Sequence, residues 1–118
     1  MKIKDQVLEY IKTEYGEEIT FPFKKFPEDG VFRHSDHGKW FALIMTITAD
    51  KIGLDSNEKL DILDVKVDPE ILGSLRKDEG FYPGYHMNKD YWITIVLDGT
   101  VSLDKITPLI DMSFELTK

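Results

Sequence analysis

Hydrophobic periodicity predicts three helices along the chain. Residues 3–15 repeat apolar side chains at the spacing of one helical face. Residues 68–80 begin with Asp68 at an N-cap position and Pro69 at the first helical position. Residues 102–118 again place their apolar side chains on a single stripe. We therefore expect a helix at each end of the chain and a short helix between them.

Alternation of apolar and polar residues predicts four strands. The runs are GVFRH (30–34), KWFALIMTITA (39–49), LDILDVKV (60–67) and YWITIVL (91–97). The turn-forming residues SDHG join the first two runs as a hairpin. The predicted order of elements is α-β-β-β-α-β-α. This order indicates an α+β fold, in which an antiparallel sheet carries its helices on one face.

The same alternation assigns the strand residues to two faces of the sheet. The face beneath the helices is expected to carry Phe41, Leu43, Met45, Ile47, Leu63, Val65, Val67, Ile93, Ile95 and Leu97. The opposite face is expected to carry Trp40, Ala42, Ile44, Thr46, Asp64, Lys66, Trp92, Thr94 and Val96. Two interpretations of this second face are open. The tryptophans stand on an exposed surface, or a loop or the first helix covers them.

Length and composition favour one soluble domain. At 118 residues and 42% hydrophobic content, the chain can bury a single core, and we expect one domain over residues 1–118. No apolar run approaches the roughly 20 residues that span a bilayer, and no signal peptide is evident. We therefore expect a cytoplasmic protein without a membrane partner. The absence of cysteine excludes disulfides, a thiolate nucleophile and cysteine-ligated metals.

The charge of the chain argues against a broad nucleic-acid surface. Fifteen basic residues against twenty-two acidic ones give a formal net charge of −7. DNA-binding proteins usually carry a basic patch or stripe. Any surface that binds an anion is therefore expected to be local. Its candidate polar contacts are Arg33, His34, Lys39, His86, Asn88 and Lys89, with Lys24 and Lys25 as extensions.

The stretch GYHMNKDYWITIVLDG, residues 84–99, concentrates candidate chemistry. Asn88 and Lys89 could bind an anion, and a protonated His86 could join them. In the structural alternative, Asn88 shapes the turn before the strand, His86 bonds a backbone carbonyl and Lys89 is solvated. In either case Gly84 is expected to supply backbone freedom. The aromatic residues that could stack on a planar ligand are Tyr85 and Trp92.

Four segments together resemble the MmcQ/YjbR family. They are GKWFAL (38–43), VKVDPE (65–70), PGYHMNKDYWITIVLDG (83–99) and LIDMSFEL (109–116). The members are small bacterial proteins with a CyaY-like fold, and the resemblance covers most of residues 30–118. It implies an antiparallel sheet packed on one side by helices. It also implies DNA binding, because members are commonly described as DNA-binding.

We therefore expect a non-enzymatic binding domain with DNA as the first candidate partner, bound weakly and in a salt-sensitive manner. The candidate contacts are Arg33, His34, Lys39, Trp40, Tyr85, His86, Asn88, Lys89 and Trp92. No catalytic residue, cofactor or metal ligand is expected. No nucleotide-binding glycine loop, metalloprotease motif or nucleophile elbow occurs in the sequence.

Two alternatives belong to other functional classes. The first is a protein-interaction module that uses the sheet face around Trp40 and Trp92, since tryptophan is enriched in interface hot spots. The second, less favoured, is an acidic metal binder by analogy with frataxin. Its carboxylates would be Asp5, Glu9, Glu14, Glu17 and Glu18. Because no histidine accompanies them at ligand spacing, a solvated helix face is the better explanation of these carboxylates.

Overall fold

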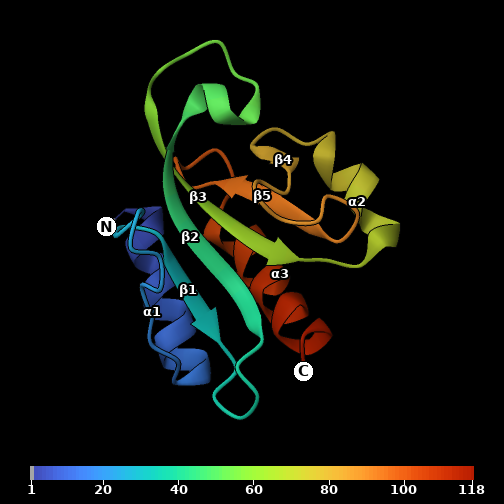
Figure 1. The fold of residues 1–118 in the computed structure, drawn as a ribbon. Helices are drawn as coiled ribbons and strands as arrows, with labels where there is room; N and C mark the ends of the chain where they lie inside the picture. Colours follow the sequence, from blue (N-terminus) through green and yellow to red (C-terminus); the bar gives the residue numbers. More distant parts are fainter. Residues whose placement is uncertain (1) are drawn as a thin grey trace.

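The computed structural model describes residues 2–118 and confirms the α+β fold (Figure 1). The helices are α1 (Ile3–Tyr15), α2 (Pro69–Arg76) and α3 (Leu103–Leu116), with a short 3-10 helix, η1, at Ala49–Ile52. The strands are β1 (Gly30–Arg33), β2 (Trp40–Thr48), β3 (Lys59–Lys66), β4 (Phe81–Pro83) and β5 (Trp92–Val96). Each predicted helix and strand is present. Within residues 2–118, no helix is long and apolar enough to cross a membrane.

The five strands form one antiparallel sheet in the order β1-β2-β3-β5-β4. Helices α1 and α3 lie side by side on one face of this sheet, while α2 lies at the edge formed by β4 and β5 (Figure 1). The main core fills the space between the sheet and the two long helices, with Val7 and Ile11 of α1 and Ile106 and Ile110 of α3 fully buried.

Strand β4 is missing from the predicted order. It has three residues and pairs antiparallel with β5 at the edge of the sheet. A run this short shows no alternation, and Pro83 at its end argues against a strand. Proline is tolerated there because an edge strand leaves one side of its backbone unpaired.

A β-bulge in β2 overturns the predicted faces of that strand. Phe32 pairs with Ala42 and Arg33 pairs with Trp40, so Phe41 has no partner on β1. Two consecutive residues, Phe41 and Ala42, consequently lie on the helix-covered face. From that point the alternation is inverted, because an extra residue shifts every later side chain to the other face. Leu43, Met45 and Ile47 pack on the opposite face, and Ala42 and Ile44 lie in the main core. The predicted faces of β3 and β5 are confirmed.

The second face of the sheet is largely covered by two loops. Phe23, from residues 21–29, and Tyr85 and Met87, from residues 84–91, pack on a smaller apolar cluster there. Trp92 is consequently 8% exposed, and Trp40 is partly buried. Of the two interpretations left open by the sequence, the covering loop is therefore the correct one for Trp92.

Candidate functional site

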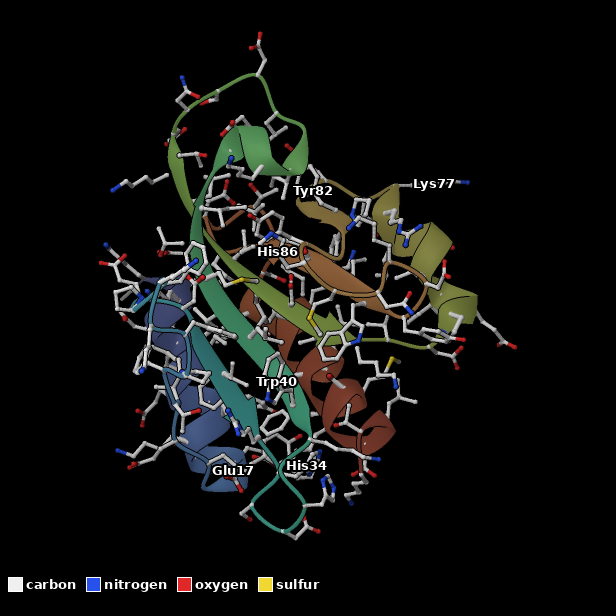
Figure 2. All side chains as sticks on the ribbon, in the orientation of Figure 1. Glu17, His34, Trp40, Lys77, Tyr82 and His86 are labelled. Atoms are coloured by element: carbon white, nitrogen blue, oxygen red, sulfur yellow. The ribbon has the colours of Figure 1, made fainter. Side chains whose placement is uncertain are left out.

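An aromatic cleft remains where the two loops meet over β2. Its volume is about 270 Å³. It is lined by Phe23, Phe26, Asp29, Trp40, Leu43, Met45, His86 and Met87. Trp40 and His86 mark its position over the sheet in Figure 2. We call it the aromatic cleft throughout.

Residues 21–29 form the outer wall of the cleft through tight turns. The Phe26 amide donates to the Phe23 carbonyl at 3.1 Å, and the Asp29 amide donates to the Phe26 carbonyl at 3.0 Å. The Phe23 ring meets the Trp40 ring edge-on, with ring centres 5.8 Å apart. Phe26 lies further out and is 56% exposed. The loop therefore buries one ring against the sheet and leaves another open to solvent.

The carboxyl in the cleft wall belongs to Asp29. Burial raises the pKa of this carboxyl above its ordinary value, while the charge of His86 acts in the opposite direction. His86 itself is exposed, with a left-handed φ of 60°, and its ring stacks on Tyr85 with centres 4.0 Å apart. The polar part of the cleft is thus small beside its apolar lining.

Residues 84–91 form the inner wall and bond mainly to themselves. The Asn88 side-chain carbonyl accepts from the Asp90 amide at 2.9 Å, and the Asn88 backbone carbonyl accepts from the Trp92 amide at 2.9 Å. The Lys89 ammonium donates to the Gly84 carbonyl at 3.0 Å. This geometry agrees with the structural alternative for Asn88 and gives Lys89 a partner within the loop.

Position 84 requires glycine for a different reason from the one expected from the sequence. It is not among the glycines with positive φ, and a Cβ atom at this position would lie 2.9 Å from both the Cβ atom and the carbonyl oxygen of Trp92. Close packing of the loop against β5, rather than backbone freedom, requires glycine here.

A buried carboxyl lies beneath this inner wall. Asp64, in the middle of β3, is fully buried, and the Thr94 hydroxyl donates to its Oδ1 at 2.5 Å. The same hydroxyl accepts from the Tyr85 amide at 2.8 Å, which ties the loop to the sheet. Burial raises the pKa of Asp64 to about 7, opposed by the Thr94 hydrogen bond and the charge of Lys89. Its Oδ2 has no hydrogen-bond partner among the described residues.

The nine predicted contact residues do not form one surface. Trp40 and His86 line the aromatic cleft, and the Arg33 guanidinium lies 5.9 Å from the centre of the Trp40 ring. Trp92 and His34 are buried, at 8% and 5% exposure. Of the others, Lys39 lies in the turn between β1 and β2, and Tyr85, Asn88 and Lys89 lie in the loop of the inner wall without lining the cleft.

His34 lies on the other side of the sheet from the cleft. Its ring packs on Phe41 and Phe114, with ring centres 5.2 and 4.3 Å away. Burial lowers the pKa of His34, with a further decrease from His37. A neutral, buried ring of this kind is not a surface contact for an anion.

Six cleft residues were missed from the sequence: Phe23, Phe26, Asp29, Leu43, Met45 and Met87. The signal for the first two is the segment FPFKKF, residues 21–26, which places three phenylalanines in a loop where apolar side chains have no strand or helix to bury them. Leu43 and Met45 were assigned to the wrong face because the bulge has no signature in the alternation.

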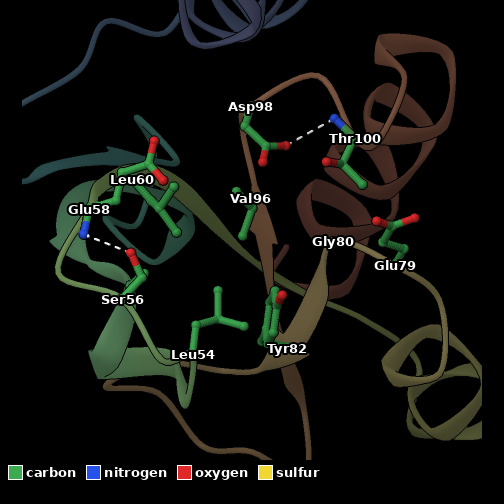
Figure 3. A pocket seen from close by; sticks show the side chains of 11 residues that line it. Leu54, Ser56, Glu58, Leu60, Glu79, Gly80, Tyr82, Val96, Asp98 and Thr100 are labelled. Atoms are coloured by element: carbon green, nitrogen blue, oxygen red, sulfur yellow. Dashed lines mark hydrogen bonds between the residues drawn. The ribbon is translucent and has the colours of Figure 1, made fainter.

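A second hollow, at the other end of the sheet, carries more acidic side chains beside its apolar ones (Figure 3). It has a volume of about 200 Å³, and three carboxylates, Glu58, Glu79 and Asp98, stand among its lining residues. The hydrogen bonds drawn in Figure 3 are local: the Glu58 amide donates to Ser56 Oγ at 3.0 Å, and the Thr100 amide donates to Asp98 at 2.9 Å. They close turns, and we assign no ligand to this acidic hollow.

Comparison with known proteins gives matches over almost the whole chain. A family model described as YjbR matches residues 13–116. The uncharacterized protein YyaQ of Bacillus subtilis (strain 168) is 41% identical over 118 residues, which cover 100% of both chains. A crystal structure of a Pseudomonas syringae protein has a TM-score of 0.94 at 47% identity and covers 98% of each chain. The Deinococcus radiodurans protein DR2400 has a TM-score of 0.74 at 31% identity, covering 98% of this chain and 78% of its own.

Proposed function

The chain belongs to the YjbR family, and on that fold we propose a non-enzymatic binding module whose aromatic cleft binds an exposed segment of a partner protein. The cleft is the observation that carries the proposal. Three aromatic residues and two methionines line it, and Phe26 at its rim is 56% exposed. Aromatic and methionine side chains are enriched in the buried centres of protein interfaces, where tryptophan often dominates the affinity.

The charge around the cleft defines the partner further. Residues 21–49, which include most of the cleft lining, contain four basic and three acidic residues, whereas the whole chain has a net charge of −7. Arg33 lies over Trp40, and Lys39 precedes it in the chain. Complementary charge favours a partner segment in which an aromatic or large apolar side chain is flanked by carboxylates.

Single-stranded nucleic acid is a second candidate, favoured by the cation beside the Trp40 ring. Proteins that bind unpaired strands combine stacking rings with basic side chains. Here the basic contacts are fewer than the sequence predicted. His34 is buried, and the Lys89 ammonium bonds a carbonyl of its own loop. Such binding would therefore be weak and would decrease steeply with added salt.

A parallel NMR titration separates the two candidates. Backbone amide spectra of the protein are recorded with an acetylated peptide, Glu-Asp-Trp-Asp-Glu, and with short single- and double-stranded oligonucleotides at about 50 mM salt, a condition that favours phosphate contacts. The proposal predicts peptide-induced shifts at Phe26, Trp40 and Met87. A peptide in which serine replaces tryptophan should leave these amides unchanged.

Two results would overturn the protein-partner proposal. One is a set of shifts at the cleft that arises with the oligonucleotides and not with the peptide, which would assign the cleft to nucleic acid. The other is a set of peptide shifts outside the cleft, or of equal size with the serine control, which would show that the aromatic side chain is not recognised.

A further inference from the structure

The turn between β1 and β2 brings together three side chains that can ligate a metal. His34, Asp36 and His37 each offer one ligand atom, and these atoms lie within 4.8 Å of one another. Among residues 2–118, this is the one such group of three or more His, Asp or Glu side chains. The carboxylates that the frataxin analogy singled out, on α1 and just after it, form no group of this kind in the part of the chain that the structure describes. We propose that the 34–37 turn binds a divalent transition-metal ion of the zinc type.

The hydrogen bonds of His34 hold its ring in a form suited to a metal. Its Nε2 lies 2.7 Å from the Thr117 hydroxyl, and that hydroxyl donates to the Ser113 carbonyl at 2.7 Å. Because the hydroxyl hydrogen is used in this way, the hydroxyl accepts from His34, and the proton of the neutral ring lies on Nε2. Nδ1 therefore keeps its lone pair. A second-shell hydrogen bond of this kind orients metal-ligating histidines in known sites.

His37 and Asp36 already have a spacing that suits one ion. The distance from His37 Nε2 to Asp36 Oδ1 is 3.5 Å. Ligands of a tetrahedral zinc ion lie about 3.4 Å apart, given metal–ligand distances of about 2.1 Å. Movement of this exposed turn towards the buried His34 brings all three ligands around one ion. Two imidazoles with a carboxylate favour a first-row transition metal over calcium or magnesium, which prefer oxygen ligands.

Metal binding has a defined consequence within the turn. The Lys39 amide now donates to His37 Nδ1 at 3.2 Å, so the proton of the neutral His37 ring lies on Nε2. Ligation through Nε2 moves that proton to Nδ1, and the Lys39 amide loses its acceptor. The bond is exposed, so water replaces the lost partner at little cost. The Lys39 amide is therefore a reporter of binding at this site.

The surroundings favour a cation and are separate from the aromatic cleft. The three residues line a hollow of about 450 Å³ together with Glu17 and Lys118, and none of them lines the cleft. Figure 2 shows Glu17 and His34 next to each other at this end of the molecule. The Lys118 ammonium lies 3.1 Å from a Glu115 carboxylate, which offsets its charge. Metal binding at this site can thus be tested independently of the proposed peptide binding.

Calorimetric titration of the untagged protein with zinc chloride at pH 7 tests the proposal. We expect one ion per chain, with affinity reduced at least about tenfold in His37→Ala and also reduced in Asp36→Asn. The chain has three histidines, so His86→Ala, in the aromatic cleft, is the matched control and should bind zinc like the wild type. His34 is left intact because its buried ring supports the core.

NMR spectra identify the site directly. Zinc should shift the Lys39 and Thr117 amides and leave those of Phe26 and Met87 unchanged. The proposal is overturned if the wild type shows no saturable binding, or if His37→Ala and His86→Ala bind zinc equally. It is also overturned if the zinc-induced shifts cluster at the amides of acidic residues elsewhere, such as those that line the acidic hollow.

Discussion

The two loops that wall the aromatic cleft use their residues in opposite ways. Residues 84–91 contain the histidine, amide and lysine that suggest a reaction centre or an anion site, yet Asn88 and Lys89 bond within the loop. Residues 21–29 contain no such cluster, yet they leave Phe26 open to solvent beside Trp40. Polar residues that lie close together in a sequence can thus serve to hold a loop, while an exposed apolar surface comes from residues that a loop cannot bury.

The largest effect on stability should come from Asp64, the buried carboxyl beneath the inner wall. Burial raises the pKa of Asp64 from an ordinary 3.8 to about 7. Between these values the unfolded carboxyl is ionised while the folded one keeps its proton, so stability decreases as pH rises and levels off above pH 7. We therefore compare the unfolding free energy of Asp64→Asn with that of the wild type at each pH. The difference should shift in favour of the variant by roughly 3 kcal/mol from pH 5 to pH 8.

Urea melts of both proteins at the two pH values measure this change. The difference between the two proteins removes the contributions of all other acidic groups, which titrate alike in both. A stability difference that stays constant from pH 5 to pH 8 would show that Asp64 is ionised throughout and that the inner wall does not shield it.

A smaller loss is expected where the inner wall approaches β5. In Gly84→Ala, the new Cβ would lie 2.9 Å from Trp92 atoms, including a backbone oxygen that cannot move freely. Overpacking of this kind costs roughly 1–3 kcal/mol. Gly73→Ala is the control, because it lies in α2 with no atom within 4 Å of its new Cβ. Thermal melts should show the first variant destabilised and the second unchanged or stabilised.

A still smaller loss should follow from Asn88→Ala. The substitution removes the acceptor of the Asp90 amide, an exposed hydrogen bond of 2.9 Å, and should cost about 1 kcal/mol. Lys24→Ala in the outer wall should change stability by less than about 0.5 kcal/mol. Equal effects of the two substitutions in denaturant melts would contradict the view that polar side chains hold the inner loop but not the outer one.

Most of the fold could be predicted from the sequence because its elements have local signals. Asp68 caps α2 by accepting from the Glu70 amide at 2.9 Å, and Gly16 ends α1 with a left-handed φ of 67°. The β2 faces could not be predicted beyond Phe41, since the bulge depends on pairing with β1. Strand β4 was likewise missed because its pairing with β5 defines it.

The site could be predicted only in part. Trp40 and His86 were identified and do line the aromatic cleft. Phe23 and Met87 come from loops that are distant in sequence, and only the fold brings them together. His34 was identified as a polar residue near a strand end, but its burial against Phe114 of α3 depends on how that helix packs.

The affinity of two matched variants for the Glu-Asp-Trp-Asp-Glu peptide tests the central claim most directly. Phe21 and Phe26 lie in the same segment and are 55% and 56% exposed, but only Phe26 lines the aromatic cleft. Both Phe21→Ser and Phe26→Ser should keep the unfolding free energy within about 0.5 kcal/mol of the wild type. Phe26→Ser should bind the peptide at least about tenfold more weakly, while Phe21→Ser should bind it as the wild type does. Equal affinities of the two variants would contradict the assignment of the aromatic cleft as the binding site.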